Sequence, residues 1–241
     1  MTRTLDPTTL SVAHDPTVGL RRTTAAVALP LAFALQLACN AVYAWISTAS
    51  GLTDTEGAAE ALELYGRFPT ATTVSTVLAM TGVLVMLAGM PAAVRVLRPR
   101  TPRLVLWAAA LMTAGYVCYL GIVTTNFGTI GLAGFALAHP DAGAVEAFEA
   151  GRSPVLVPFF LLFVIGNLVG TLLLGIAVLR SRDLPWYAGA LIIGWPVGHV
   201  VNIAGGGEWF AVAGGALEVA GLAIVAAAAM RLTDAQWAAR G

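Results

Sequence analysis

Long uncharged apolar stretches dominate the pattern of hydrophobic and polar positions along this chain of 241 residues. Five of them contain no charged residue and occupy residues 23–50, 70–94, 104–138, 153–179 and 184–207. A sixth, residues 209–230, contains a single charged residue, Glu218. A helix needs about 20 apolar residues to cross the hydrocarbon of a bilayer, where its backbone must pair internally. The pattern predicts an all-α fold, a polytopic membrane bundle of about six transmembrane helices, here called spans one to six in chain order.

The third stretch, residues 104–138, is too long for one span and too short for two. We expect a span from Leu104 to about Asn126, because the segment that follows, residues 127–139, is interrupted by Gly128, Gly131 and Gly134. These residues are expected to form a short interfacial or re-entrant piece, and a seventh span is the alternative topology.

The two ends of the chain have a different composition from the spans. Residues 1–22, with two prolines and scattered polar groups, predict a disordered cytoplasmic tail, and residues 233–241 a second cytoplasmic tail. The membrane domain is expected over residues 23–232. A cleavable signal peptide is not expected, because its apolar core is only about 7–15 residues long.

Two loops on the expected outer side have the spacing of amphipathic helices. In the first, residues 53–56 (TDTE) form a capping-box pattern, and apolar residues recur at helical spacing opposite Glu56, Glu60 and Glu63. The apolar set is Ala58, Ala59, Leu62, Tyr65 and Phe68. In the second, Asp141 is the expected cap of a shorter helix with Val145 and Phe148 on one side. Both helices are expected to lie on the membrane surface and roof the bundle, and ordinary solvated connectors are the alternative.

Composition supports the membrane class and excludes several others. The chain is 58% hydrophobic and only 11% charged, about half the charged fraction of a soluble domain. Its net charge is zero with no strongly basic segment, which excludes a nucleic-acid partner. All thirteen basic residues are arginine, so lysine Schiff-base chemistry is excluded. Cys39 and Cys118 lie within apolar runs without a C-x-x-C spacing, so no metal site and no cofactor is expected.

The distribution of arginine predicts the orientation, because positive charge resists translocation across the membrane. With the amino terminus inside, only Arg67 and Arg152 fall in outer segments. The remaining eleven fall in inner segments: Arg3, Arg21, Arg22, Arg95, Arg98, Arg100, Arg103, Arg180, Arg182, Arg231 and Arg240. We therefore expect a multi-pass protein of a bacterial plasma membrane with both termini in the cytoplasm and the lipid bilayer as its surroundings.

Two inner turns repeat a short pattern. Residues 96–100 (VLRPR) recur as residues 178–182 (VLRSR), and each turn leads into a span with an early tryptophan, Trp107 or Trp186. Spans two and three would then correspond to spans four and five in the same orientation. Arginine is common in any tight inner turn, so the match can also be convergent.

One further pattern comprises residues 166–170 (GNLVG), residues 174–182 (LGIAVLRSR), Pro185 and Trp186. It resembles a pattern in uncharacterised multi-spanning membrane proteins of actinobacteria. The resemblance covers roughly the fourth and fifth spans. It implies a membrane fold and a bacterial inner membrane, and it implies no activity.

Glycine pairs predict where the helices touch, because membrane helices associate through close approach at small residues. Such pairs occur in span four at Gly166 and Gly170 and in span five at Gly194 and Gly198. Span six contributes Gly214, Gly215 and Gly221.

Polar side chains inside the spans concentrate in their outer halves, and such groups usually face a cavity or a partner. We expect an outward-opening polar pocket bounded by spans one, three, four, five and six, with Thr171 beside it. The candidate ligand-binding residues are Gln36, Asn40, Tyr43, Tyr116, Tyr119, Asn126, Asn167, His199, Asn202 and Glu218.

Glu218 is the one carboxylate deep in a span, and it and His199 are the candidate catalytic residues. Counted from the glycine turn at residues 205–207, Glu218 lies about 15 Å and His199 about 9 Å inward, so a contact between them is expected. The pair can be a functional site or a structural hydrogen bond. Pro196 is expected to kink span five beside the pocket, although membrane helices also tolerate proline.

Three functional hypotheses remain open at this stage. The first is a carrier or binding protein for a small molecule or lipid, expected to work as a homodimer because six spans are few for a carrier. The second is an intramembrane enzyme acting on an isoprenoid or other lipid, with Glu218 as acid and Asn40, Asn167 and the tyrosines positioning the substrate. The third is an accessory or sensor subunit of a membrane complex. No ATP-binding loop is present, which argues against nucleotide-driven pumping.

Overall fold

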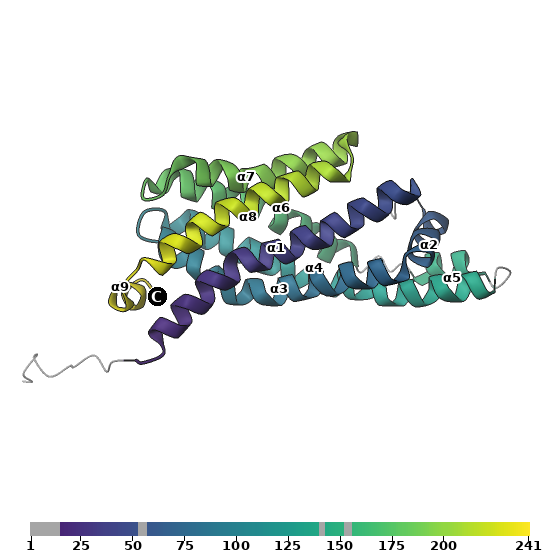
Figure 1. Ribbon diagram of the computed structural model, residues 1–241, viewed down its shortest axis with the longest axis horizontal. Coiled ribbons are helices and arrows are strands. Elements are labelled where there is room, and N and C mark those ends of the chain that lie inside the picture. Colours follow the sequence, from purple (N-terminus) through teal and green to yellow (C-terminus); the bar gives the residue numbers. More distant parts are fainter. Residues whose placement is uncertain (1–14, 53–56, 140–142, 152–155) are drawn as a thin grey trace, which may run out of the picture.

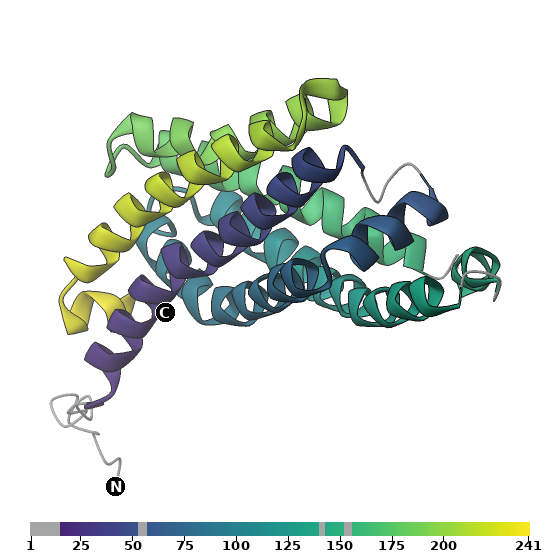
Figure 2. The same ribbon diagram turned by 45° about the vertical axis from the view of Figure 1, so that its right-hand side comes forward.

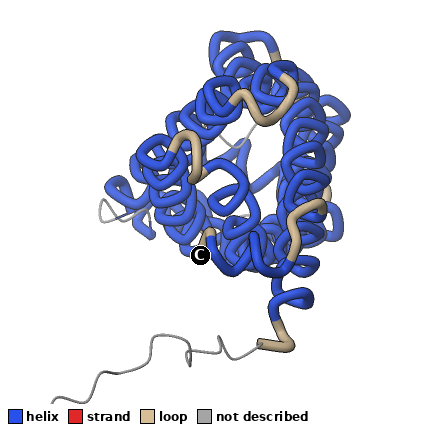
Figure 3. The backbone as a smooth tube through the Cα atoms, turned by 90° about the vertical axis from the view of Figure 1, so that its left-hand side faces the viewer, coloured by secondary structure: helices blue, strands red, loops and turns tan. Residues whose placement is uncertain are grey.

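The computed structural model describes residues 15–52, 57–139, 143–151 and 156–241. Six long helices form the bundle: α1 (Val18–Ser50), α3 (Pro69–Leu97), α4 (Pro102–Ala138), α6 (Leu156–Ser181), α7 (Trp186–Val201) and α8 (Glu208–Met230). Three short helices complete the fold: α2 (Ala58–Arg67), α5 (Ala144–Gly151) and α9 (Asp234–Ala239). A π-helical turn, η2 (Asn202–Gly206), extends α7. An end-on view of the described residues shows helices joined by short loops, without a strand (Figure 3).

All six long helices are long and apolar enough to cross a membrane, with η2 counted as the end of α7. Their outward surfaces carry exposed leucine, valine and phenylalanine side chains, as expected where lipid replaces water. The protein is therefore an integral, multi-pass membrane protein, and the predicted helix bundle with six spans is confirmed.

Glycines bring neighbouring helices into backbone contact. α1 packs along α3 and α8, α4 along α6, and α7 along both α6 and α8 (Figures 1 and 2). A Cβ atom added to Gly166 would lie 2.3 Å from the Leu111 carbonyl oxygen, and one added to Gly198 would lie 2.4 Å from that of Phe210. The predicted glycine surfaces of spans four, five and six are confirmed as helix contacts, and others occur that were not predicted: Gly82, Gly89, Gly115, Gly175 and Gly189.

The expected break in the third span is wrong. α4 continues as one helix of 37 residues to Ala138, so residues 127–138 form neither a separate re-entrant piece nor a seventh span. At about 55 Å it is far longer than the roughly 30 Å of hydrocarbon, so it must extend beyond the hydrocarbon. Around Ala133, this extension packs against Leu62 and Tyr65 of α2 and Ala144 of α5. Tertiary packing therefore outweighs the low helix propensity of the three glycines.

The short helices α2 and α5 confirm the amphipathic segments predicted in the two loops, while both predicted capping positions, residues 53–56 and Asp141, lie outside the described residues. α2 buries Leu62 and Tyr65 as expected. Ala59 is exposed and Leu64 is fully buried, because α2 packs against α4 and α5 together and its buried face is displaced from the predicted one.

The described chain ends meet at one end of the bundle. α1 begins at Val18, inside the predicted tail, and the guanidinium of Arg22 forms an ion pair of 2.8 Å with Asp234 of α9. α9 lies inside the second predicted tail and starts with a capping box between Thr233 and Gln236. Its Trp237 is buried against the bundle.

The two arginine-bearing turns lie at this same end. Arg100 in the turn after α3 pairs with Asp183 in the turn after α6 over 3.2 Å. Trp107 and Trp186, which follow these turns, are both exposed to the surroundings of the bundle. The correspondence between the two helix pairs stays a prediction.

Candidate functional site

A cavity of about 1110 Å³ lies between the long helices at the end of the bundle away from the arginine-bearing turns. Its walls come from the second half of α1, the first halves of α3 and α6, the middle of α4, and the region where α7, η2 and α8 meet. Leu52, Gly205 and Gly207 are among the lining residues, so the cavity reaches the loops at the end of the bundle. Helix α2 was expected to roof the bundle, and its Tyr65 is among the residues that line the cavity wall.

All of the predicted site residues except Glu218 line this cavity. They are Gln36, Asn40, Tyr43, Tyr116, Tyr119, Asn126, Asn167, His199 and Asn202. Sequence reasoning missed the contribution of α3, which supplies Thr72 and Ser75. The hydroxyl of Thr72 donates to the Phe68 carbonyl oxygen of its own helix over 2.9 Å, and such local bonds make threonine and serine common in any apolar helix. Polarity alone therefore did not single them out.

The deep wall of the cavity is a buried hydrogen-bonded cluster centred on Asn167. Its side-chain oxygen accepts a bond of 2.6 Å from the indole N–H of Trp195 and one of 3.3 Å from the hydroxyl of Tyr116. Asn167 is only 3% exposed. The cluster joins α4, α6 and α7, and a satisfied network of this kind holds its side chains in one arrangement.

Aromatic rings form a flat apolar surface beside this cluster. The rings of Tyr119 and Phe163 stack with their centroids 4.3 Å apart and an interplanar angle of 16°. Tyr116 packs edge-on against both of them. Across the cavity wall, Trp195 stacks on the imidazole of His199 at 5.2 Å. Rings in such arrangements offer large apolar surfaces with a polar edge.

Some buried polar atoms near the cavity have no hydrogen-bond partner in the protein. They include Nδ1 of His199, Oγ1 of Thr171 and Oε1 of Glu218. Buried polar atoms are almost always paired, so an unpaired one calls for a water molecule or a ligand group. His199 also lines the cavity, although its Nδ1 atom itself is covered by protein.

The expected contact between Glu218 and His199 is not formed, and no hydrogen bond or ion pair joins these two described residues. The register between α7 and α8 explains the difference. Gly198 packs against Gly214, and Gly194 packs against Leu217, so Glu218 lies level with the part of α7 one turn deeper than His199. Glu218 is 3% exposed and has the Thr171 hydroxyl beside it.

The irregular turn η2 shapes the mouth of the cavity. α7 stays helical through Pro196 as far as Val201, and the helical form changes at Asn202–Gly206. Gly205 has a φ of 97°, a left-handed conformation that favours glycine. The Asn202 amide donates to the Glu208 carboxylate over 3.0 Å and holds this turn closed against the start of α8.

The cavity lining carries little charge. No arginine is among its described lining residues, and the ionisable groups there are Glu208, His199, Cys39 and the tyrosines. Glu208 is engaged by Asn202, and the Cys39 sulfur lies 3.2 Å from the Ser75 hydroxyl. The polar groups of the lining are therefore mainly amides, hydroxyls and one imidazole, set among aromatic and aliphatic side chains.

No protein-family model, no curated protein and no solved structure matches this chain. The functional argument therefore starts from the geometry of the cavity in a six-span membrane protein.

Proposed function

We propose that this protein binds a neutral, amphipathic small molecule or lipid in the cavity between its helices. The observation that carries the proposal is the cavity of about 1110 Å³, whose lining combines the stacked Tyr119 and Phe163 rings with the imidazole of His199. Binding sites typically combine an apolar lining with a few convergent polar groups in this way.

The lining chemistry favours a ligand without net negative charge. A buried anion needs arginine, lysine or several N–H donors, and the described lining has no guanidinium. Amide side chains of Gln36, Asn40 and Asn126 offer donors and acceptors to hydroxyl, ether or carbonyl groups. The aromatic wall accommodates an apolar body, such as a ring system or an isoprenoid chain.

The cavity is closed toward the arginine-bearing turns, which is consistent with a carrier held in one of its two states. The half of the bundle toward the arginine-bearing turns is filled by a core that includes Leu29, Met86 and Leu222, all of which are 0–2% exposed. Passage to the other side requires these helices to separate. Transport is therefore the step that distinguishes a carrier from a binding protein.

The proposed orientation follows from the arginines gathered at one end of the bundle with both described chain ends. By the positive-inside rule that end faces the cytoplasm, and the cavity opens to the extracytoplasmic side of a bacterial plasma membrane. A homodimer is the proposed working unit.

The enzyme hypothesis loses the geometry on which it depended, because Glu218 is not among the cavity-lining residues. The accessory-subunit hypothesis makes a separate prediction, that the chain is unstable without a partner. Purification as a stable homodimer would argue against it.

The test of binding compares molecules that copurify with the wild-type protein and with a variant whose cavity is blocked. Asn40→Trp places a large ring in the cavity, and Val77→Trp adds the same ring to the exposed outer face of α3 as a matched control. Mass spectrometry of extracts from detergent-purified protein is expected to find a small molecule or lipid with the wild type and Val77→Trp that is absent from Asn40→Trp. Identical extracts from all three proteins would contradict the proposal.

If such a molecule is found, proteoliposomes loaded with it distinguish the two versions of the proposal. Exchange across the membrane that Asn40→Trp abolishes supports a carrier. Retention without exchange supports a binding protein.

A further inference from the structure

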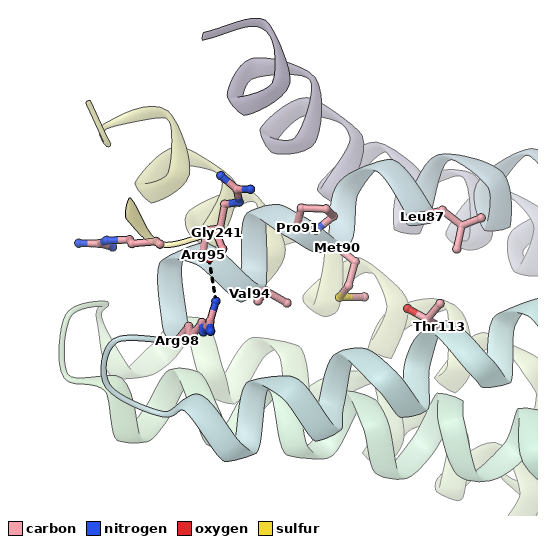
Figure 4. Close-up of a pocket in the computed structure, with 9 residues that line it drawn as sticks. Leu87, Met90, Pro91, Val94, Arg95, Arg98, Thr113 and Gly241 are labelled. Carbon is pink, nitrogen blue, oxygen red and sulfur yellow. Dashed lines mark hydrogen bonds between the residues drawn. The ribbon is translucent and has the colours of Figure 1, made fainter. Parts of the chain in front are cut away.

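A second pocket lies at the opposite end of the bundle from the cavity, on the outer side of α3 and α4. Its volume is about 380 Å³, and it is separate from the proposed ligand site. Figure 4 shows Arg95, Arg98 and Gly241 gathered at one end and Leu87 and Thr113 at the other. The full lining is Leu87, Met90, Pro91, Val94, Arg95, Arg98, Thr113, Arg240 and Gly241, and we call it the arginine groove.

The polar end of the arginine groove carries positive charge without a matching carboxylate side chain. Arg95, Arg98 and Arg240 line it, no aspartate or glutamate does, and none of the three forms an ion pair with a described acidic residue. By contrast, Arg22 and Arg100 at the same end of the molecule are each paired with an aspartate. The terminal carboxylate of Gly241, which accepts from Arg98, offsets part of this charge, so the groove keeps a net positive charge.

The guanidinium groups are held in place yet keep free donors. Arg95 lies over the Trp237 ring at 4.5 Å and donates to the Trp237 carbonyl oxygen over 2.7 Å. Arg98 donates to the carbonyl oxygen of Gly241 over 3.1 Å. A guanidinium has five N–H donors, so most of them remain available to an anion.

The groove becomes apolar toward the middle of the membrane. From Arg98 to Leu87 is eleven residues of α3, a distance of about 16 Å along the helix and about half of the hydrocarbon thickness. Met90, Pro91 and Val94 line the way, and Leu87 is 42% exposed at the far end. The groove is cationic at the membrane surface and apolar inside the membrane. Its polarity therefore matches that of an anionic phospholipid lying along the helix, with the headgroup at the surface and an acyl chain inside.

We infer that the arginine groove is a binding site for an anionic phospholipid, with its phosphate on Arg95, Arg98 and Arg240 and one acyl chain along Leu87 and Pro91. Basic pockets at the cytoplasmic ends of transmembrane helices bind anionic headgroups by this combination of charge and burial. Arg240 and Gly241, which directly follow α9, line the groove, so the bound lipid would contact the end of the chain.

The test uses the full chain, purified in detergent and titrated with phosphatidylglycerol or phosphatidylcholine of the same acyl chains, with binding measured by native mass spectrometry. Arg98→Gln and Arg240→Gln, alone and combined, remove the charges that are least involved in holding α9. Arg180→Gln is the matched control, because Arg180 is exposed at the same end of the molecule but does not line the groove. Leu87→Gln tests the acyl-chain end without changing the charge.

We expect the wild type to bind phosphatidylglycerol more tightly than phosphatidylcholine, and each arginine removed to weaken phosphatidylglycerol binding by roughly fivefold. Leu87→Gln is expected to weaken both lipids, and Arg180→Gln neither. Equal affinity for the two lipids, or equal losses in Arg180→Gln and Arg98→Gln, would overturn the proposal. So would full competition by soluble glycerol phosphate, which would show a phosphate site without a chain. Circular dichroism of each variant shows whether it is folded, and the single variants remain informative if the combined one is not.

Discussion

The indole N–H of Trp195 donates a hydrogen bond of 2.6 Å to the side-chain oxygen of Asn167 and so joins α7 to α6 at the deep wall of the cavity. Both residues are buried, and each also contacts another cavity-lining residue: Asn167 accepts a hydrogen bond from Tyr116, and Trp195 stacks on His199. The bond therefore connects the groups that build the deep wall to the imidazole of His199, which also lines the cavity.

Trp195→Phe tests the contribution of this bond, because phenylalanine keeps most of the ring and removes the N–H. Asn167 then has Tyr116 as its remaining donor, and we expect the free energy of unfolding to fall by about 1 kcal/mol. Thermal unfolding in detergent is the measurement. Trp209→Phe is the matched control, since the Trp209 indole donates over 3.0 Å to Thr48 at an exposed position. Equal losses in both variants would argue against a special role for the Asn167 cluster.

A pair of glycine substitutions tests how the helices pack. In Gly166→Ala the new methyl group would lie 2.3 Å from a backbone oxygen of α4, so overpacking should cost about 1–3 kcal/mol. In Gly131→Ala the methyl group meets no atom within 4 Å, so the better helix propensity of alanine should add up to about 1 kcal/mol. Unfolding curves of the two variants should move in opposite directions. A stable Gly166→Ala protein would show that α4 and α6 can separate without cost.

These packing details explain how far the fold could be predicted. The six spans follow from apolar length alone, because the bilayer requires that length whatever the helices contact. The continuation of α4 to Ala138 could not be predicted, since it depends on α2 and α5 covering Ala133. Glycines lower helix propensity locally, and the contacts that outweigh them come from residues distant in sequence.

The residues of the candidate site were likewise predicted only in part. We predicted that the amides, tyrosines and histidine in the outer halves of the spans share a pocket, because polar groups are costly in lipid. Their position around one cavity agrees with that reasoning. The separation of Glu218 from His199 could not be predicted. It depends on the register of α7 against α8, which the contact between Gly198 and Gly214 decides.

The different positions of His199 and Glu218 lead to a prediction about binding. The imidazole of His199 lines the cavity, so His199→Ala should weaken ligand retention by roughly fivefold, the loss of one polar contact. Glu218→Gln should leave retention unchanged, because residue 218 is outside the lining. The amount of copurified ligand per protein, measured by mass spectrometry, is the readout. Loss of ligand in Glu218→Gln alone would restore the hypothesis that this carboxyl acts directly on the guest.

Sidedness can be tested with reporters fused at the two ends of the bundle. Fusions after Arg100 and Asp183 should place a reporter in the cytoplasm, and fusions after Gly57 and Gly143 should place it outside. Alkaline phosphatase, active only outside, and a fluorescent protein, active only inside, give complementary readouts. The reverse pattern would put the cavity on the cytoplasmic side and contradict the proposed direction of access.

The most direct test of the central claim is a density map of the wild-type protein purified in a lipid nanodisc. We expect density that belongs to no residue of the chain between the stacked Tyr119 and Phe163 rings and His199, within hydrogen-bonding distance of the imidazole. A map in which α1, α4 and α7 close on one another and protein side chains fill this space would contradict the claim that the cavity binds a ligand.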